Sequence, residues 1–224
     1  LQGDFGTSYR TKLPVFTEIM DRFPTTLTLT VGGILLMVII GLPVGILSAV
    51  KQYSLTDNVS MIAALILNSM PSFWLGIMLM LLFSLNLGWL PSTGASTWKH
   101  FILPCVPLAT GMMASLIRMT RSNMLEVIRG EYIKMVQAKG AAERYVIIRH
   151  ALRNACLPIV TIIGMNFAKL LGGTMIIESV FDLPGLGTLA VTAVNQLDIP
   201  MVMGEVLFIS FVIDLFKRKK KEEL

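Results

Sequence analysis

The chain has 224 residues, of which 54% are hydrophobic and 15% are charged. A typical soluble domain carries roughly 25% charged residues, so this composition argues against a soluble protein and indicates several membrane spans. The formal net charge is +5, and its meaning depends on where the basic residues lie along the chain. The only cysteines and histidines lack metal-ligand spacing, so no metal site is expected; they are Cys105, Cys156, His100 and His150.

Five long apolar runs predict membrane-spanning helices, because a helix needs about 20 apolar residues to cross the hydrocarbon core. The second run is expected to kink at Pro71, and the third is expected to break near Pro104 and Pro107. The last run is marginal in length. The predicted spans are 27–50, 61–87, 101–117, 158–177 and 201–216. The expected fold class is therefore all-α, a polytopic membrane helical bundle.

Lys and Arg lie mainly on one side of these spans. Fourteen of the 19 basic residues fall in the connection 118–157, in the tail 217–224 or at Lys51. Basic residues collect on the cytoplasmic side, so this asymmetry predicts that the connection and the tail are cytoplasmic. Residues 1–26 then form an extracytoplasmic lead segment before a transmembrane domain, 27–216, and at least one further span is expected before Leu1. The charge needs no nucleic acid to explain it, and the chain is expected to be a multi-pass protein of the cytoplasmic membrane.

A charged, helix-forming insert interrupts the apolar pattern at residues 131–154, "EYIKMVQAKGAAERYVIIRHALRN". We expect two helices, 118–139 and 142–154, joined at Gly140, because glycine adopts the left-handed conformation that often follows a helix C-terminus. The second helix carries one apolar stripe, formed by Tyr145, Ile148 and Leu152. Such a stripe needs a partner. From the residues alone, a protein partner and an anionic lipid surface explain it equally well.

The stretch "EYIKMVQAKGAAERYVIIRHALRNACLP" resembles the cytoplasmic "EAA" loop of ABC importer permeases, most closely in the oligopeptide, dipeptide and nickel branch. The positions that match are Glu131, Tyr132, Ala138, Lys139, Gly140, Arg149, His150, Leu152, Arg153, Asn154 and Pro158. The sequence departs from the family at Val136, where a small alanine is usual, and at Ala142, where a serine would cap the second helix. Without that cap, the second helix is expected to begin with a frayed turn.

Two further stretches extend the resemblance over nearly the whole chain. "GDFGTSYRTKLPVFTEIMDRFPTTLTL" resembles the extracytoplasmic lead into a span of this branch, and "ESVFDLPGLGTLAVTAVNQLDIPMVMG" resembles its outer loop between the last two spans. Three separated motifs in the right order are far more specific than one.

The resemblance implies a permease subunit of an ATP-driven importer for peptides or a related small solute, such as a nickel complex, that performs no covalent chemistry. The implied partners are a second, similar permease, two cytoplasmic ATPase subunits, an extracytoplasmic solute-binding protein and membrane lipid, with no nucleic acid. The sequence has no phosphate-binding loop of the form G-x-x-x-x-G-K-[ST], so ATP would be hydrolysed by the partner subunits and this chain would bind no cofactor. The implied ATPase-coupling residues are Glu131, Tyr132, Lys134, Ala138, Lys139, Gly140, Glu143, Arg149, His150, Arg153 and Asn154.

A second group of residues is predicted to line the translocation path or its gate. Lys169 and Glu205 lie within predicted spans, where ionisable residues usually face protein or water. One hypothesis is that they pair in only one state of transport; the alternative is a structural pair or a snorkelling lysine. For Asn68 and Pro71, the alternative is a helix kink whose freed backbone carbonyl is hydrogen-bonded locally. For residues 184–187, the alternative is an ordinary turn. The predicted path residues are Asn68, Pro71, Lys169, Glu178, Asp182, Pro184, Gly185, Gly187 and Glu205.

Two other functions stay open at this point. An ion-gradient-driven secondary transporter or channel would use Lys169 and Glu205 as coupling charges, and a membrane scaffold would move no solute. The charged insert argues against both, because neither needs a docking site for an ATPase. The residues do not identify the solute.

Overall fold

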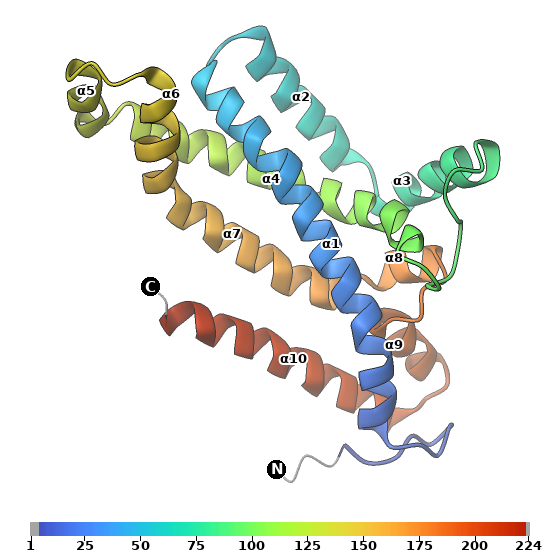
Figure 1. Ribbon diagram of the computed structural model, residues 1–224. Helices are drawn as coiled ribbons and strands as arrows, with labels where there is room; N and C mark the ends of the chain where they lie inside the picture. Colours follow the sequence, from blue (N-terminus) through green and yellow to red (C-terminus); the bar gives the residue numbers. More distant parts are fainter. Residues whose placement is uncertain (1–4, 223–224) are drawn as a thin grey trace. The chain divides into compact units, whose positions relative to one another are not determined.

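The protein is all-α in the computed structural model, which describes residues 5–222, with side chains described as far as residue 215 (Figure 1). Within these residues there is no β-strand, and a single antiparallel bridge joins Thr7 and Pro14. The expected fold class is confirmed. Residues 1–4 of the predicted lead segment and residues 223–224 of the predicted basic tail lie outside the described residues, as do the side chains of the rest of that tail.

Ten α-helices and two π-helical stretches make up the described chain. In order they are α1 (Val15–Val50), α2 (Leu55–Ser69), α3 (Ser72–Leu79), η1 (Met80–Asn86), α4 (Lys99–Ile128), α5 (Glu131–Ala138), α6 (Glu143–Tyr145), η2 (Val146–Ala151), α7 (Leu152–Gly173), α8 (Met175–Val180), α9 (Leu186–Asn195) and α10 (Ile199–Glu222). Here η marks the π-helices, and α6, η2 and α7 form one continuous helix, Glu143–Gly173.

Each of the five predicted spans overlaps one or more of the described helices. α1, α4 and the continuous helix Glu143–Gly173 are each long and apolar enough to cross a membrane. α2 and the α3–η1 helix count as a fourth span only when they are taken together as one broken span rather than as a re-entrant loop. The helix is interrupted between them at Met70 and Pro71, where the sequence predicts a kink. α10 is 24 residues long and extends the predicted fifth span at both ends.

The predicted break near Pro104 and Pro107 is wrong, because α4 runs unbroken from Lys99 to Ile128 through both prolines. A proline inside a helix removes one hydrogen bond to the carbonyl four residues earlier. Leu103 and Leu108, which flank the prolines, are only 3% and 6% exposed. Their packing holds the helix together despite the lost hydrogen bonds.

The first predicted helix of the insert, 118–139, is interrupted. α4 ends at Ile128, and α5 begins at Glu131. Gly130 between them has an extended backbone, with φ −65° and ψ 148°, which no helix residue adopts. The sequence pattern placed the only glycine break at Gly140 and missed this one.

The second predicted helix of the insert does not end at Asn154. It continues through Pro158 into the predicted fourth span, which ends at Gly173 rather than at residue 177. Ala155 and Ile159, on either side of the proline, are buried in the same hydrophobic core. This packing outweighs the single hydrogen bond that Pro158 removes.

The chain forms two compact units. Unit 1 comprises the described parts of Leu1–Gly33, Ser72–Leu108 and Phe167–Leu224, and unit 2 comprises Ile34–Pro71 and Ala109–Asn166. The core of unit 2 joins side chains of α1, α2, α4, α5 and the η2–α7 helix, including Met37, Met124, Ile133 and Ile159. In unit 1, α1, α9 and α10 meet in a second core that includes Val15, Ile19, Leu186, Met201 and Phe208.

Candidate functional site

The charged insert forms a helical hairpin in unit 2, which we call the hairpin (residues 131–154). Gly140 follows Lys139, the C-terminal cap of α5, and has φ +81°, as the sequence pattern predicts. Ala142 caps the next helix without a side-chain hydrogen bond, which agrees with the absence of the usual serine. The turn therefore depends on one left-handed glycine and has no side-chain cap behind it.

Buried apolar side chains attach the hairpin to the rest of unit 2. Ile133 of α5 is 1% exposed, Val146 of η2 is 2% exposed, and both belong to the same core as Met124 of α4. The hairpin is thus held by its inner face, and its other side chains are available to a partner.

A cluster of polar and aromatic side chains forms around His150. The Tyr132 hydroxyl lies 2.7 Å from His150 Nδ1, and the rings of Tyr132 and Tyr145 lie 5.7 Å and 5.3 Å from the His150 ring, edge to face. A pocket of about 250 Å³ opens beside them. Its lining residues are Tyr132, Tyr145, Arg149, His150, Arg153 and Asn154. All but Tyr145 were predicted to couple to an ATPase. The fold brings Tyr132 beside predicted coupling residues that lie 17 to 22 positions later in the chain.

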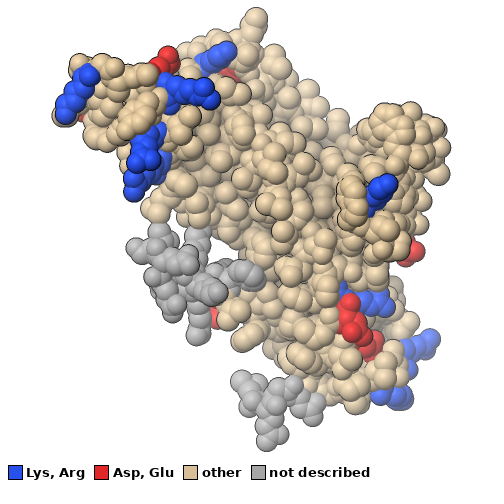
Figure 2. Space-filling view, viewed as in Figure 1, with Lys and Arg blue, Asp and Glu red and all other residues tan. Residues whose placement is uncertain are grey.

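The outer face of the hairpin is basic and partly apolar. Figure 2 shows Lys and Arg side chains over α5 and α6. Tyr145 and Ile148 of the predicted stripe are 54% and 55% exposed, so the chain itself does not cover them. The predicted coupling residues that are exposed are Glu131, Tyr132, Lys134, Ala138, Lys139, Gly140, Glu143, Arg149, Arg153 and Asn154.

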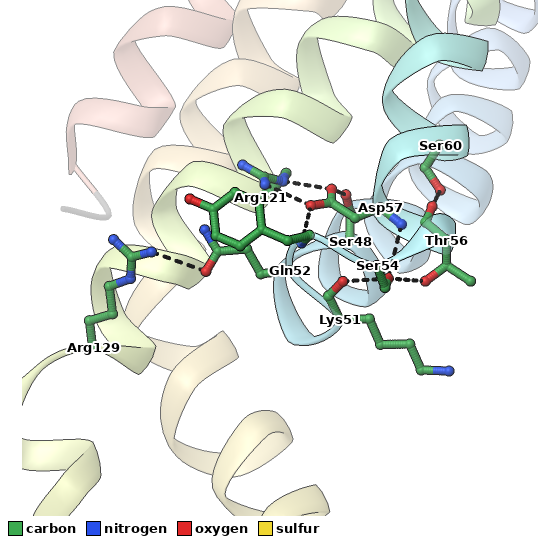
Figure 3. Close-up of polar contacts among 10 residues, drawn as sticks. Ser48, Lys51, Gln52, Ser54, Thr56, Asp57, Ser60, Arg121 and Arg129 are labelled. Carbon is green, nitrogen blue, oxygen red and sulfur yellow. Dashed lines mark hydrogen bonds and ion pairs between the residues drawn. The ribbon is translucent and has the colours of Figure 1, made fainter.

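Asp57, near the start of α2, is a buried acid that the sequence analysis did not single out. It is 2% exposed and forms an ion pair with Arg121 of α4 (Figure 3). Arg121 had been counted only as one of the basic cytoplasmic residues. The sequence feature that could have pointed to Asp57 is an acid in the first turn of a helix, three residues after a serine cap. Ser54 is that cap, and its side chain accepts a hydrogen bond from the Asp57 N–H.

In unit 1, Glu178 of α8 organises the predicted outer loop. It is fully buried, and its Oε1 accepts hydrogen bonds from the hydroxyls of Thr26 and Thr174, each at 2.7 Å. Its Oε2 accepts the backbone N–H of Thr188 at 3.1 Å. Glu178 therefore ties α1, α8 and α9 together within the unit instead of standing on an open surface.

The two glycines of the "PGLG" turn allow close packing around this carboxylate. A Cβ atom added at Gly185 would overlap the Glu178 carboxyl group, and one added at Gly187 would overlap the backbone of Met175. Any larger residue at either position forces α9 away from α8.

Asp182 and Pro184 lie beside a cavity of about 680 Å³ in unit 1. Asp182 has φ +49°, a left-handed conformation that is uncommon outside glycine. The cavity also carries the basic residues Arg10 and Arg22, and Figure 2 shows basic and acidic side chains gathered in this region. Of the predicted path residues, these two are the ones that line an open cavity in unit 1.

The remaining predicted path residues differ in exposure. Asn68, Pro71 and Lys169 are exposed. Glu205 is 2% exposed, and neither of its carboxylate oxygens has a hydrogen-bond partner among the described residues. This conformation therefore lacks the hypothesised Lys169–Glu205 pair, and a pair formed in another state stays a prediction.

Asp198, between α9 and α10, fastens the lead segment. It accepts hydrogen bonds from the Ser8 hydroxyl and from the backbone N–H groups of Tyr9 and Arg10. Burial would raise the pKa of Asp198, but these bonds and one from the Met201 N–H together lower the pKa below its ordinary value. The lowered pKa means that the charged carboxylate is the form that holds the segment.

We expect Asp198→Asn to loosen residues 8–11 at neutral pH. A hydrogen bond to a charged group contributes about 1.5–3 kcal/mol, so amide exchange in this segment should speed up by about tenfold or more. The pKa of Asp198 is lower in the folded protein than in the unfolded chain, where it is about 3.9. The stability that Asp198 contributes is therefore complete above the unfolded pKa and is lost as the pH falls through the folded pKa. Hydrogen exchange followed by mass spectrometry checks this, with the exposed Asp182→Asn as control. Equal exchange in wild type and Asp198→Asn would contradict it.

Comparison with known proteins agrees with the helical architecture. Residues 41–216 match the family described as "Binding-protein-dependent transport system inner membrane component". The chain is similar to the membrane subunit in inward-facing structures of the MetNI methionine ABC transporter, with a TM-score of 0.76, 20% sequence identity and coverage of 92% of this chain and 94% of that one. At this identity the structural likeness supports the fold alone.

Curated relatives match over nearly the whole chain. The glutathione transport system permease protein GsiC of Salmonella typhi is 43% identical over 210 residues, which are 94% of this chain and 69% of the relative. The GsiC proteins of Pectobacterium atrosepticum and Escherichia coli (strain K12) are 44% and 42% identical over the same shares. The chain therefore belongs to the family of binding-protein-dependent transport system inner membrane components, as a permease subunit of an ABC importer and not an enzyme.

Proposed function

We propose that this permease carries glutathione or a closely related small peptide inward, driven by ATP that its partner subunits hydrolyse. The solute class is supported by the curated relatives at 42–44% identity over 94% of the chain, which are named for glutathione transport. The proposed assembly contains a second, similar permease, two cytoplasmic ATPase subunits and an extracytoplasmic solute-binding protein. The chain itself binds no cofactor and no metal.

The proposal that this chain couples to an ATPase rests on the hairpin. It is fixed to unit 2 by Ile133 and Val146 and presents Tyr145 and Ile148, both more than half exposed, beside Arg149 and Arg153. An apolar surface with a charged rim is the usual composition of a protein interface. A chain without a phosphate-binding loop uses ATP only through contact with a protein that has one, and this surface is suited to that contact.

In unit 1, the outer loop is proposed to form the gate and the docking surface for the binding protein. Glu178, Gly185 and Gly187 hold α8 and α9 tightly together, so the loop moves as one piece. Asp182 and Pro184 are the exposed part of that piece. Asn68, Pro71, Lys169 and Glu205 remain proposed path residues on the basis of their positions in spans.

The test is uptake by the complete transporter reconstituted in proteoliposomes with its binding protein. We expect labelled glutathione to accumulate only when ATP is enclosed with the ATPase subunits and the binding protein is outside, and to persist when ionophores collapse all ion gradients. Unlabelled glutathione should compete more strongly than nickel ions or a longer oligopeptide. Uptake that needs an ion gradient and not ATP would favour a secondary transporter, and failure of glutathione to compete would remove the proposed solute.

A further inference from the structure

The turn between α1 and α2 is fastened to α4 by a buried polar network within unit 2 (Figure 3). Arg121 donates from Nε to Asp57 Oδ1 and from Nη2 to Asp57 Oδ2, both at 2.8 Å. Ser48 at the end of α1 donates to Oδ1, and the Tyr53 N–H donates to Oδ2 at 2.9 Å. One carboxylate thus holds the end of α1, the turn and α4 in a single arrangement.

The backbone of the turn is itself shaped around this carboxylate. Tyr53 has φ +62°, a left-handed conformation that is uncommon for a residue other than glycine. That conformation aims the Tyr53 N–H at Asp57. A second contact lies farther along α4, where Arg129 Nη2 donates to Gln52 Oε1 at 3.0 Å.

Close packing already joins α1 to α4 without the ion pair. A Cβ atom added at Gly45 of α1 would lie 2.7 Å from the Thr120 Cβ of α4. A buried ion pair adds little net stability over an apolar pair of the same shape, but its two-pronged geometry permits only one register. The network therefore fixes position more than it adds stability.

The same stretch of α4 reaches the hairpin. Arg121 and Met124 are three residues apart, so they lie on one face of α4. Met124 is fully buried in the core that contains Ile133 and Val146, the two anchors of the hairpin. One face of α4 therefore carries both Met124, which shares a core with the hairpin anchors, and Arg121, which pairs with Asp57 at the start of α2.

We propose that Asp57 and Arg121 are a positioning pair that transmits movement of the hairpin to α2. This rests on the proposed role of the hairpin as the ATPase contact. When the ATPase subunits shift the hairpin, α4 moves with it through the shared core, and the bidentate pair makes α2 follow at a fixed register. Without the pair, the hairpin still binds the ATPase, but the helix that leads to Asn68 and Pro71 no longer follows in step.

The test is the number of solute molecules imported per ATP hydrolysed by the complete transporter in proteoliposomes. For Arg121→Met we expect ATP hydrolysis to continue while this ratio falls by about fivefold or more, the lower end of typical coupling between sites. Arg121→Lys keeps the positive charge but not the two-pronged contact with Asp57, so its ratio should lie between those of the wild type and Arg121→Met. Arg118→Met, an exposed residue one turn earlier on the same helix, is the matched control and should keep the wild-type ratio.

The ratio separates positioning from loss of folded protein, because fewer intact transporters reduce uptake and hydrolysis in the same proportion. The double variant Asp57→Asn with Arg121→Met should lower the ratio no further than the worse single variant does. An unchanged ratio in Arg121→Met overturns the proposal. If that variant does not assemble, Arg121→Lys decides, since it keeps the positive charge and loses only the two-pronged contact with Asp57; a lowered ratio supports the proposal and an unchanged one overturns it.

Failure of the underlying function gives a different pattern. If the hairpin is not the ATPase contact, hairpin variants leave co-purification of the ATPase subunits unchanged. If only the positioning role is wrong, the ATPase subunits depend on the hairpin for binding, and Arg121→Met transports with the wild-type ratio.

Discussion

Gly140→Val is expected to abolish solute uptake while the protein still inserts into the membrane. The residue has φ +81° and no heavy atom among the described residues lies within 4 Å of an added Cβ, so the effect comes from the backbone alone. A side chain in this conformation costs about 1–2 kcal/mol, and the β-branched valine is a strong outlier there. The turn should refold, so that α5 and α6 present their exposed residues in a different arrangement.

The measurement is uptake together with the amount of ATPase subunit that co-purifies. Gly140→Asn is the matched control, because asparagine tolerates the left-handed conformation better than other residues do. Its uptake should stay well above that of the valine variant. Normal uptake by Gly140→Val would show that the turn geometry is not needed for coupling.

Gly187→Ala is expected to cause the second large loss, at the outer loop. The added methyl group would overlap the Met175 backbone and lie 2.8 Å from the Met175 Cβ and N atoms. No change of rotamer relieves a clash with backbone, and such overpacking typically costs about 1–3 kcal/mol. α9 should therefore separate from α8, which removes the Thr188 N–H from Glu178.

Uptake and the melting temperature of the purified complex should both fall in Gly187→Ala. The matched control is Gly172→Ala in α7, where no described heavy atom lies within 4 Å of the added Cβ. Alanine is about 1 kcal/mol more favourable than glycine inside a helix, so the control should not destabilise the chain. Wild-type melting and uptake in Gly187→Ala would show that α8 and α9 are not tightly packed in the working transporter.

Features that depend on local sequence were predictable. Long apolar runs located the helices, and the isolated glycine in a charged stretch located the turn at Gly140, because one residue's backbone preference decides that geometry. The prolines misled the prediction: Pro104, Pro107 and Pro158 each remove a hydrogen bond, but buried neighbours keep all three inside helices.

The buried polar contacts of Asp57 and Glu178 could not be predicted, because the residues that form them are far apart in the chain. Asp57 and Arg121 are separated by 64 positions, and Thr26 and Glu178 by 152. No local pattern distinguishes an acid that will be buried from one at the surface. The hairpin is short, so the spacing along its two helices largely determines which side chains meet around His150. The role of these residues in ATPase coupling stays a prediction.

The uninterrupted helix from Glu143 to Gly173 constrains how the chain length of this region varies. In an α-helix each residue turns the side chains by about 100°, so one inserted residue between Asn154 and Pro158 would rotate Tyr145 and Arg149 by that angle relative to the apolar residues that follow. A deletion would rotate them the other way. A change of about seven residues, close to two full turns, nearly restores the phase. The spacing between the hairpin and the membrane is therefore tied to helical phase, and substitutions are tolerated there more readily than changes of length.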